Sequence, residues 1–254
     1  MQPPVKLGVA IPCHALGNIA TSALLAIQRS PLVEENFPFV QMIGSALTMN
    51  HNRCWAWALN EHRAGRISHF LLMHSDIEPQ MQHWIEVLIE EMERNEADVL
   101  GCFIAIKNPQ GLTSTAIDTD PWRPRRISLR EAKQLPVTWT APNLLLNTGL
   151  LLFHLDSFAY GGIPCFRVTD KIERDASGNF AAYHQPEDWN FSRQCHALEK
   201  RLYVTRGIRV AHAGIAVYPN APAWGQETDK DCVRGSDEWL LMDQQEGPQL
   251  REMN

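Results

Sequence analysis

The first 106 residues alternate between short apolar runs and longer stretches with helical spacing, and this alternation constrains the fold more than any other feature. The apolar runs, which predict buried strands, span residues 5–13, 37–46, 67–76 and 97–106. The stretches between them, which predict helices, span residues 15–30, 48–62 and 79–95. Because strands that alternate with helices form right-handed crossovers, we expect an α/β fold, with a mostly parallel sheet and helices on both faces.

The chain after residue 106 is less regular, and its pattern predicts two long loops and a second group of elements. Residues 107–142 are rich in Pro, Thr and Arg and predict a long loop or a substrate-facing insertion. Residues 160–186 predict another loop. The predicted elements are a strand, turn and strand over 144–158, a helix over 186–201, and strands over 202–205 and 208–214.

Length and composition are those of an ordinary soluble globular protein. The chain has 254 residues, of which 44% are hydrophobic and 20% charged. No run approaches about 18 consecutive apolar residues, and the first ten residues carry one charge, Lys6, so we expect no membrane span, no secretory leader and a cytoplasmic location. The six cysteines lie far apart without a CxxC pair, which favours buried free thiols over disulfides or structural zinc.

One local segment is basic, although the net charge of −6 argues against a general nucleic-acid binder. Residues 122–133, WRPRRISLREAK, carry four arginines and one lysine against one glutamate. A solvated surface loop would account for this composition. A clamp for an anionic substrate would account for it equally well, because guanidinium groups match phosphate oxygens.

The third predicted strand ends in a polar triplet. In HFLLMHSDIEP, residues 69–79, four apolar residues lead directly to His74, Ser75 and Asp76. Residues two apart on an extended segment point to the same face, so His74 and Asp76 are expected to reach one ion or substrate group together. Ligands of parallel sheets bind beyond the carboxyl ends of strands, where this triplet and residues 12–14 lie. The alternative is an ordinary strand end that turns polar as it leaves the core.

Two further clusters could hold an ion or move a proton. Glu187 and Asp188 begin a predicted helix, and His212 ends a predicted strand. With the triplet they offer oxygen and nitrogen ligands suited to Mn²⁺ or Mg²⁺, whereas the HExxH motif or close histidine pair typical of zinc is missing. Each cluster has a structural alternative, because acidic residues favour helix N-termini and His212 could be a core histidine.

The order of these motifs resembles that of nucleotide-sugar-dependent glycosyltransferases of the GT-A type, close to the family 2 group. The resemblance covers about residues 5–214. In chain order it is carried by GVAIPCH, by Asn52-Arg53 in MNHNRCWAWAL, and by FLLMHSDIEP, NTGLLLFHLDSF, PEDWNFSRQCHALEKRLYV and IRVAHAG. One position departs from the pattern: the family's Asp-x-Asp motif begins with Asp, and this chain has His74 there.

The resemblance implies a single GT-A-like domain over residues 1–254. Its parts would be a nucleotide-binding half over residues 5–106, an acceptor and metal half over 107–214, and a C-terminal extension over 215–254. The implied activity is transfer of a sugar from a nucleoside-diphosphate sugar to an acceptor hydroxyl. The acceptor stays open among polysaccharide, lipid-linked glycan, protein, small metabolite and modified nucleic-acid base.

The resemblance also implies a role for individual residues. A divalent ion, Mn²⁺ or Mg²⁺, would bridge the donor phosphates, with Asp76 and His212 as its ligands and His74 as a third candidate. By similarity to inverting members, Asp188 would be the base that deprotonates the acceptor, with Glu187 orienting it or contacting the acceptor. The nucleotide-side candidates are Pro12, His14, Asn52, Arg53, His74, Ser75 and Asp76. The candidates for acceptor or sugar contacts are Trp139, Asn147, Gly149 and Trp189.

Two other functions remain open. Histidine at position 74, where the family's motif has aspartate, is also compatible with a non-catalytic nucleotide-sugar or carbohydrate-binding protein of the same fold. A nucleotidyltransferase would normally carry a Gly-rich, basic loop after its first strand, whereas IPCHALGN has one glycine and no lysine or arginine. Trp139 and Trp189 could each also serve only to pack the core.

Overall fold

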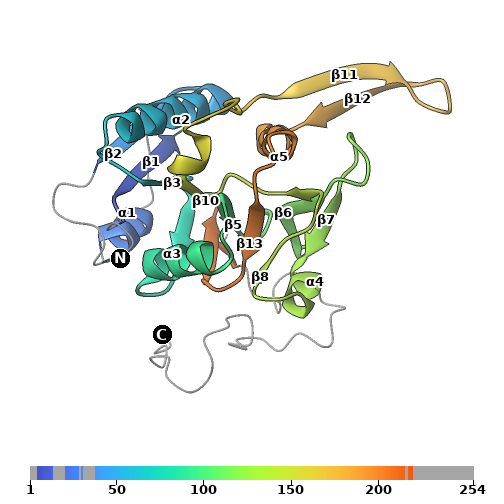
Figure 1. Ribbon diagram of the computed structural model, residues 1–254. Helices are drawn as coiled ribbons and strands as arrows, with labels where there is room; N and C mark the ends of the chain where they lie inside the picture. Colours follow the sequence, from blue (N-terminus) through green and yellow to red (C-terminus); the bar gives the residue numbers. More distant parts are fainter. Residues whose placement is uncertain (1–4, 14–20, 29, 31–37, 215–216, 220–254) are drawn as a thin grey trace.

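A seven-stranded sheet forms the centre of the protein (Figure 1). The computed structural model describes residues 5–13, 21–28, 30, 38–214 and 217–219. His14 and nearly all of the predicted C-terminal extension lie outside these residues. The strand order is β2(Phe39–Ile43)-β1(Leu7–Cys13)-β3(His69–Met73)-β10(Leu150–His154)-β5(Val99–Cys102)-β13(Leu202–Thr205)-β8(Thr138–Trp139).

The sheet is mixed but mostly parallel. β1 pairs in parallel with both β2 and β3, and β13 pairs in parallel with β5. β10 runs antiparallel between β3 and β5, and β8 closes the edge antiparallel to β13. The strands predicted over residues 5–13, 37–46, 67–76 and 97–106 thus all belong to this sheet.

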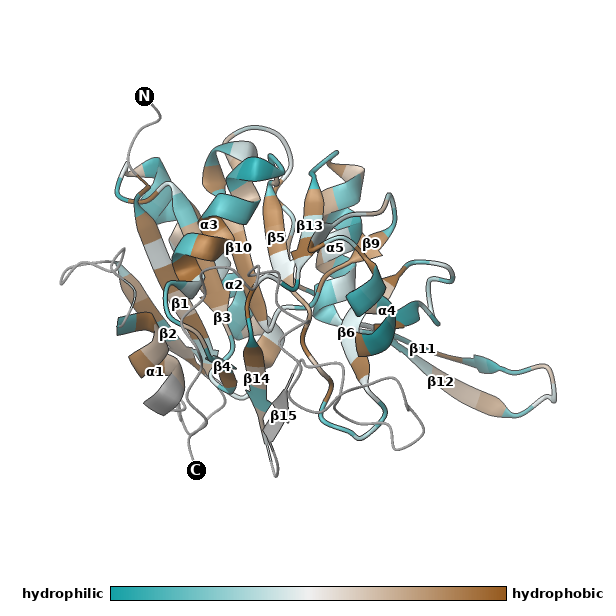
Figure 2. Cartoon of the chain, turned by 90° about the horizontal axis from the view of Figure 1, so that it is seen from below, coloured by the Kyte–Doolittle hydropathy of each residue, from teal (hydrophilic) through white to brown (hydrophobic). Residues whose placement is uncertain are grey.

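Helices cover both faces of the sheet, as Figures 1 and 2 show from two directions. α2(Leu47–Arg63) and α5(Glu187–Ala197) share one apolar core with Phe70 and Leu72 of β3. α1(Thr21–Gln28) and α3(Trp84–Arg94) share the other core with Leu71 and Met73. Successive β3 side chains therefore alternate between the two cores, as strand geometry requires. The predicted α/β class, a Rossmann-like, mostly parallel sheet with helices on both faces, is confirmed, whereas the GT-A type stays a prediction.

Trp55 of α2 is the centre of an aromatic cluster that fastens this helix to the sheet. Its ring centroid lies 5.0 Å from that of Phe153, 5.1 Å from Phe158 and 6.0 Å from Phe191, the last two in edge-on contact. Its indole Nε1 also donates to the carbonyl of Pro164 at 2.9 Å. The buried ring thus combines a large apolar contact with a satisfied polar atom.

The segment 107–142, predicted as a long loop, instead contains regular structure. It forms β6(Leu112–Ile117), β7(Arg125–Ser128), α4(Leu129–Gln134) and β8. β6 pairs with β7 and with β9(Leu144–Leu145) in a separate small sheet. The sequence pattern does not indicate β6, because two of its inward residues are threonines rather than apolar residues. These are Thr113 and Thr115, whose buried hydroxyls have partners within the chain.

The segment 160–186, also predicted as a loop, contains a β-hairpin that projects from the body of the protein (Figure 1). It consists of β11(Thr169–Arg174) and β12(Phe180–Gln185). Asp175 closes its turn by accepting hydrogen bonds from the backbone of Ser177 and Asn179, and Gly178 supplies the positive φ. Because both faces of the hairpin are largely exposed, its strands lack the apolar alternation by which a strand is recognised.

The remaining secondary-structure elements predicted after residue 142 are confirmed, including the helix over 186–201, which is α5. The strand, turn and strand over 144–158 are β9 and β10, followed by the short 3-10 helix η1(Leu155–Phe158). The strands over 202–205 and 208–214 are β13 and β14(Val210–Ala213). β14 pairs with β4(Ile77–Pro79) and β15(Val217–Pro219) in a third sheet.

Two further findings concern the described part of the chain. Of its five cysteines, Cys13, Cys54, Cys102 and Cys195 are buried and free, and Cys165 is exposed. No helix there is long and apolar enough to cross a bilayer.

Replacing Trp55 tests how far the aromatic cluster supports the fold. We expect Trp55→Ala to lower the free energy of unfolding by about 3–5 kcal/mol, because a large buried ring leaves a cavity. Urea unfolding followed by circular dichroism measures this. Ile172→Ala, on the hairpin where the side chain is 75% exposed, should change stability by less than about 0.5 kcal/mol. Equal losses of unfolding free energy in the two variants would show that Trp55 does not support the fold.

Candidate functional site

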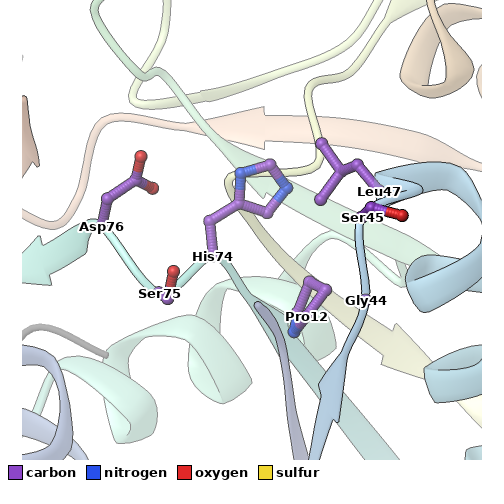
Figure 3. A pocket seen from close by; sticks show the side chains of 7 residues that line it. All are labelled: Pro12, Gly44, Ser45, Leu47, His74, Ser75 and Asp76. Carbon is purple, nitrogen blue, oxygen red and sulfur yellow. The ribbon is translucent and has the colours of Figure 1, made fainter. Parts of the chain in front are cut away.

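A cavity of about 200 Å³ lies at the carboxyl ends of the first three parallel strands (Figure 3). Parallel pairing of β1 with β2 and β3 brings these three strand ends to one edge of the sheet. The lining residues are Pro12, Gly44, Ser45, Leu47, His74, Ser75 and Asp76. The structure therefore brings Pro12 together with the polar triplet, at the kind of sheet edge where open α/β sheets bind ligands.

The triplet does not continue the strand, contrary to the sequence prediction. β3 ends at Met73, and residues 74–76 form a turn in which the amide of Ile77 donates to the carbonyl of His74 at 3.2 Å. The expected same-face geometry of an extended segment is therefore wrong. His74 and Asp76 still line one cavity, because the turn exposes both to it (Figure 3).

One carboxylate oxygen of Asp76 contacts both a lysine and a histidine. Oδ2 lies 2.5 Å from the ammonium nitrogen of Lys107 and 3.5 Å from Nε2 of His212. Burial alone would raise the pKa of Asp76, but contacts with His212 and Lys107 hold the pKa well below its usual range. The other oxygen, Oδ1, is buried without a hydrogen-bond partner. Asp76 is thus a stable carboxylate with an unused acceptor.

Pairing of β4 with β14 places His212 beside Asp76. His212 is the register partner of Ile77, and the amide of Ala213 donates to the carbonyl of Asp76 at 2.8 Å. Nδ1 of His212 lies 2.8 Å from the carbonyl of Ala105. Because a carbonyl only accepts, Nδ1 carries the proton, and Nε2 is the nitrogen that faces Asp76.

His74 is joined to a second histidine that the sequence analysis did not single out. Its Nε2 lies 2.9 Å from Nε2 of His51, a fully buried residue of α2. Burial lowers the pKa of His74 to about 4 and that of His51 well below its ordinary value, so both rings are neutral at pH 7. One of the two nitrogens must then donate to the other.

The direction of this hydrogen bond follows from the unpaired nitrogen of His51. Nδ1 of His51 is buried without a partner. A buried unpaired N–H costs more than an unused lone pair, so we infer that His51 donates from Nε2 and that His74 accepts there. His74 then carries its proton on Nδ1, as a donor available to a ligand of the cavity.

Asp188 lies at the first turn of α5 in a different environment. Burial, reinforced by the negative charge of Glu187, raises the pKa of Asp188 to about 8. A hydrogen bond from the amide of Trp189 at 2.7 Å and the positive charge of Arg126 act in the opposite direction. The guanidinium of Arg126 lies over the Trp189 ring, 4.8 Å from its centroid. Asp188 is therefore a carboxyl that can take or release a proton near neutral pH.

The segment between β9 and β10 connects α5 with the triplet. The hydroxyl of Ser192 donates to the carbonyl of Asp188 at 2.9 Å and accepts from the amide of Leu146 at 3.0 Å. At the other end of the segment, the carbonyl of Gly149 accepts from the amide of His74 at 2.9 Å. A short run of backbone thus ties the Asp188 helix to the turn that carries His74 and Asp76. Neither Glu187 nor Asp188 is among the residues that line the cavity itself.

Asn147 and Gly149, predicted as sugar contacts, hold this segment in place. The amide of buried Asn147 donates to the carbonyl of Cys102 at 2.8 Å and accepts from the amide of Gly149 at 3.0 Å. A Cβ at position 149 would lie 2.5 Å from Cδ1 of Ile104 and 3.0 Å from Oδ1 of Asn147, so a larger residue would have to displace these side chains. The observed role of both residues is to shape the backbone behind His74.

The other sequence candidates lie away from the cavity lining. Asn52 donates to the carbonyl of Phe166 at 2.7 Å and accepts from its amide at 2.8 Å, while Arg53 is exposed. Trp139 pairs with Val204 at the sheet edge. The roles predicted for these residues in nucleotide or sugar binding stay predictions, and His14 lies outside the described residues.

The two tryptophans predicted to contact sugar, Trp139 and Trp189, differ in the partners that they already have within the chain. Trp189 is buried, its indole donates to the carbonyl of Ser114 at 3.1 Å, and Arg126 lies over its ring. Trp139 is half-buried and packs against the core beneath α2 and α5. Trp189 follows Asp188 directly in the chain, and its amide donates to that carboxyl at 2.7 Å.

The basic segment 122–133 is partly engaged within the chain. Arg125 pairs with Glu131 at 2.5 Å, and Arg123 lies over the Tyr183 ring of the hairpin, 5.4 Å from its centroid. Arg126 extends toward Trp189 and Asp188. The predicted anion clamp stays a prediction, but one arginine of the segment does reach the environment of Asp188.

Sequence reasoning missed two residues of the site. Lys107 follows the apolar run over 97–106, so its place at a predicted carboxyl strand end was a usable signal. His51 is next to the Asn-Arg pair but sits inside a helix, where an isolated histidine gives no signal of its own. Its contact with His74 arises only from packing of α2 against the sheet.

The residues around Asp76 fit a divalent ion with two protein ligands. The carboxylate of Asp76, whose Oδ1 has no hydrogen-bond partner, and Nε2 of His212, which faces Oδ2, are suitable donors. The Nδ1–H of His212 is held by a carbonyl, as in many metal-binding histidines. Within the described ranges, no group of three His, Cys, Asp or Glu side chains could hold a metal. Phosphate oxygens and water would have to complete the coordination, as they commonly do for Mg²⁺.

Comparison with known proteins supports the fold alone. No model of a known protein family and no curated protein matches the chain. It is similar to the crystal structure of A197 from STIV, with 14% identity and a TM-score of 0.52, over 83% of this chain and 86% of that one. It is also similar to S. aureus TarS 1-349, with 12% identity and a TM-score of 0.37, over 79% of this chain and 58% of that one. The similarity to TarS is too distant to support any argument beyond the first comparison.

The raised pKa of Asp188 predicts a stability change with a definite pH dependence. In the unfolded chain this carboxyl ionises near its ordinary pKa, and in the folded protein at about 8, so the folded state holds the proton between these values and loses stability as pH rises. Asp188→Asn removes that penalty. We expect the variant to gain about 2–4 kcal/mol at pH 8 and little at pH 4.

Chemical denaturation of the wild-type protein and of Asp188→Asn at several pH values measures this difference. Glu90→Gln, at an exposed position of α3, is the matched control, with an expected change below about 0.5 kcal/mol at every pH. A gain for Asp188→Asn that does not grow between pH 4 and pH 8 would show that Asp188 ionises normally.

Proposed function

We propose that this protein is a glycosyltransferase that moves a sugar from a nucleoside-diphosphate sugar to an acceptor hydroxyl, with inversion at the anomeric carbon. The observation that carries the proposal is a pair of carboxyls with opposite pKa shifts, linked by the 146–149 backbone. Asp76 is held ionised beside His212, and Asp188 has a pKa of about 8. Such a pair suits a reaction that needs a fixed charge in one place and a proton acceptor in another.

Asp188 acts as the general base in this proposal. It accepts the proton of the acceptor hydroxyl while that oxygen attacks the anomeric carbon, and the bond to the diphosphate breaks. A base with a pKa near the working pH combines a useful ionised fraction with a real affinity for the proton. Glu187 sustains the high pKa of Asp188, and Arg126 limits it. Trp189, which lies under Arg126, supplies one wall of the acceptor side.

The cavity at the ends of β1, β2 and β3 takes the donor. Asp76 and His212 would hold a divalent ion, Mn²⁺ or Mg²⁺, which supplies positive charge to the two phosphates and to the departing diphosphate. His74 would donate from Nδ1 to an oxygen of the ribose or diphosphate. Pro12 and Leu47 supply apolar walls. In this proposal the anomeric carbon lies between the donor cavity and Asp188.

Donor binding tests the assignment of the cavity. We expect UDP or GDP with Mn²⁺ to raise the melting temperature of the wild-type protein, because a ligand that binds only the folded state stabilises it. Asp76→Ala should abolish the increase. Asp120→Ala, an exposed aspartate outside the site, should leave the increase unchanged. If no sugar nucleotide or nucleoside diphosphate shifts the melting temperature with any divalent ion, the proposed donor is wrong.

Asp188→Asn tests the base. The variant should bind the donor as the wild-type protein does and lose transfer by a factor of about 10²–10⁴, because the amide cannot accept the hydroxyl proton. Calorimetric titration measures binding, and release of free sugar or product measures turnover. Transfer at the wild-type rate would assign the base elsewhere. Normal donor binding without any sugar release, in the wild-type protein as well, would favour a non-catalytic binding protein of this fold.

A further inference from the structure

Lys107 occupies the place where a cation at the Asp76 site would be expected. Its ammonium lies 2.5 Å from Oδ2 of Asp76, the same oxygen that Nε2 of His212 approaches at 3.5 Å. The Lys107 and Asp76 side chains are each 37% exposed, so the ion pair is open to solvent at one side. Among the predicted ligands, Asp76 is the one formal negative charge, and Lys107 neutralises it.

Lys107 and His212 approach the same carboxylate oxygen. Nδ1 of His212 donates to the carbonyl of Ala105, so Nε2 is the ring nitrogen that faces Oδ2 of Asp76. A divalent ion held by the Asp76 carboxylate and by Nε2 of His212 would therefore take the place that the Lys107 ammonium occupies beside Oδ2.

We propose that Lys107 is a built-in counter-cation of the Asp76 site that a divalent ion must displace in order to bind. The inference rests on the proposed function and specifies how the ion is admitted. The flexible, partly exposed side chain of Lys107 can leave Asp76 without unfolding its surroundings. Once displaced, its ammonium is free to contact a phosphate oxygen of the donor.

Displacement couples the divalent ion to the diphosphate. With one carboxylate and one imidazole from the chain, the ion gains little when it replaces an ammonium already in position. A diphosphate adds two further oxygen ligands and gives Lys107 a new partner, so ion and nucleotide favour each other's binding. The ion alone should therefore bind weakly, and the site should select the complex of ion and nucleotide.

Direct binding of Mn²⁺ without nucleotide tests this. We expect Lys107→Met to bind Mn²⁺ about tenfold more tightly than the wild-type protein, because the competing charge is gone. Loss of the free Mn²⁺ signal in electron paramagnetic resonance measures the affinity. Lys171→Met is the matched control, because Lys171 also pairs with a carboxylate, Glu173 on the hairpin at 2.7 Å. It should bind Mn²⁺ as the wild-type protein does.

A second variant and a third measurement complete the test. Lys107→Gln keeps a polar side chain, and should show the same tighter binding if Lys107→Met is poorly folded. Adding His212→Ala to either variant should remove the gain, which ties the bound ion to this site. In the wild-type protein, a saturating nucleoside diphosphate should tighten Mn²⁺ binding by more than in Lys107→Met.

Unchanged or weaker Mn²⁺ binding in both Lys107 variants would overturn the inference. The binding measurement with UDP or GDP distinguishes failure of this inference from failure of the proposed function. If the wild-type protein binds UDP or GDP with Mn²⁺ but the Lys107 variants gain no affinity for Mn²⁺, the counter-cation role fails and the donor site stands. If no variant binds Mn²⁺ and the wild-type protein binds no nucleoside diphosphate, both fail together.

Discussion

Parallel pairing of β1 with β2 and β3 is the constraint on which the rest of the structure depends. It brings three carboxyl strand ends to one edge, and the polar triplet leaves the sheet there. Strand β10 then enters antiparallel beside β3, so that its preceding turn lies against the same edge and receives the amide of His74. Each later part of the site, including the start of α5, is positioned from that turn or from the β4–β14 pairing.

The Ser192 hydroxyl and a short run of backbone hold the two carboxyls in relation to each other. Ser192 joins the carbonyl of Asp188 to the amide of Leu146, and the carbonyl of Gly149 accepts from the amide of His74. None of these contacts involves the carboxyl group of Asp188 or Asp76, so the connection can keep its geometry while their ionisation and partners change. In the proposed function, one end of the site would exchange a proton and the other a cation without a side chain that must serve both.

The alternating half of the chain could be predicted from sequence because its strands are apolar on both faces and its helices carry an apolar stripe. The same reasoning failed for β6, whose inward residues include threonines, and for the β11–β12 hairpin, whose faces are both exposed. The residues of the candidate site also divide into those that the sequence pattern indicates and those that it does not. Residues at carboxyl strand ends, such as Asp76, could be found from the pattern. Lys107 also follows a predicted strand, but the contact partners of Lys107 and His51 could not be predicted, because they come from packing between distant segments.

The opposite pKa shifts of Asp76 and Asp188 have one physical origin applied to different surroundings. Both carboxyls are desolvated, which by itself raises a pKa. Asp76 meets Lys107 and His212 and stays ionised, whereas Asp188 meets Glu187, and the amide of Trp189 and the charge of Arg126 compensate only in part. Moving one positive charge would therefore convert either carboxyl toward the other's behaviour. Under the proposal, displacement of Lys107 by a divalent ion would keep a positive charge beside Asp76, and so would preserve the difference between the two carboxyls during donor binding.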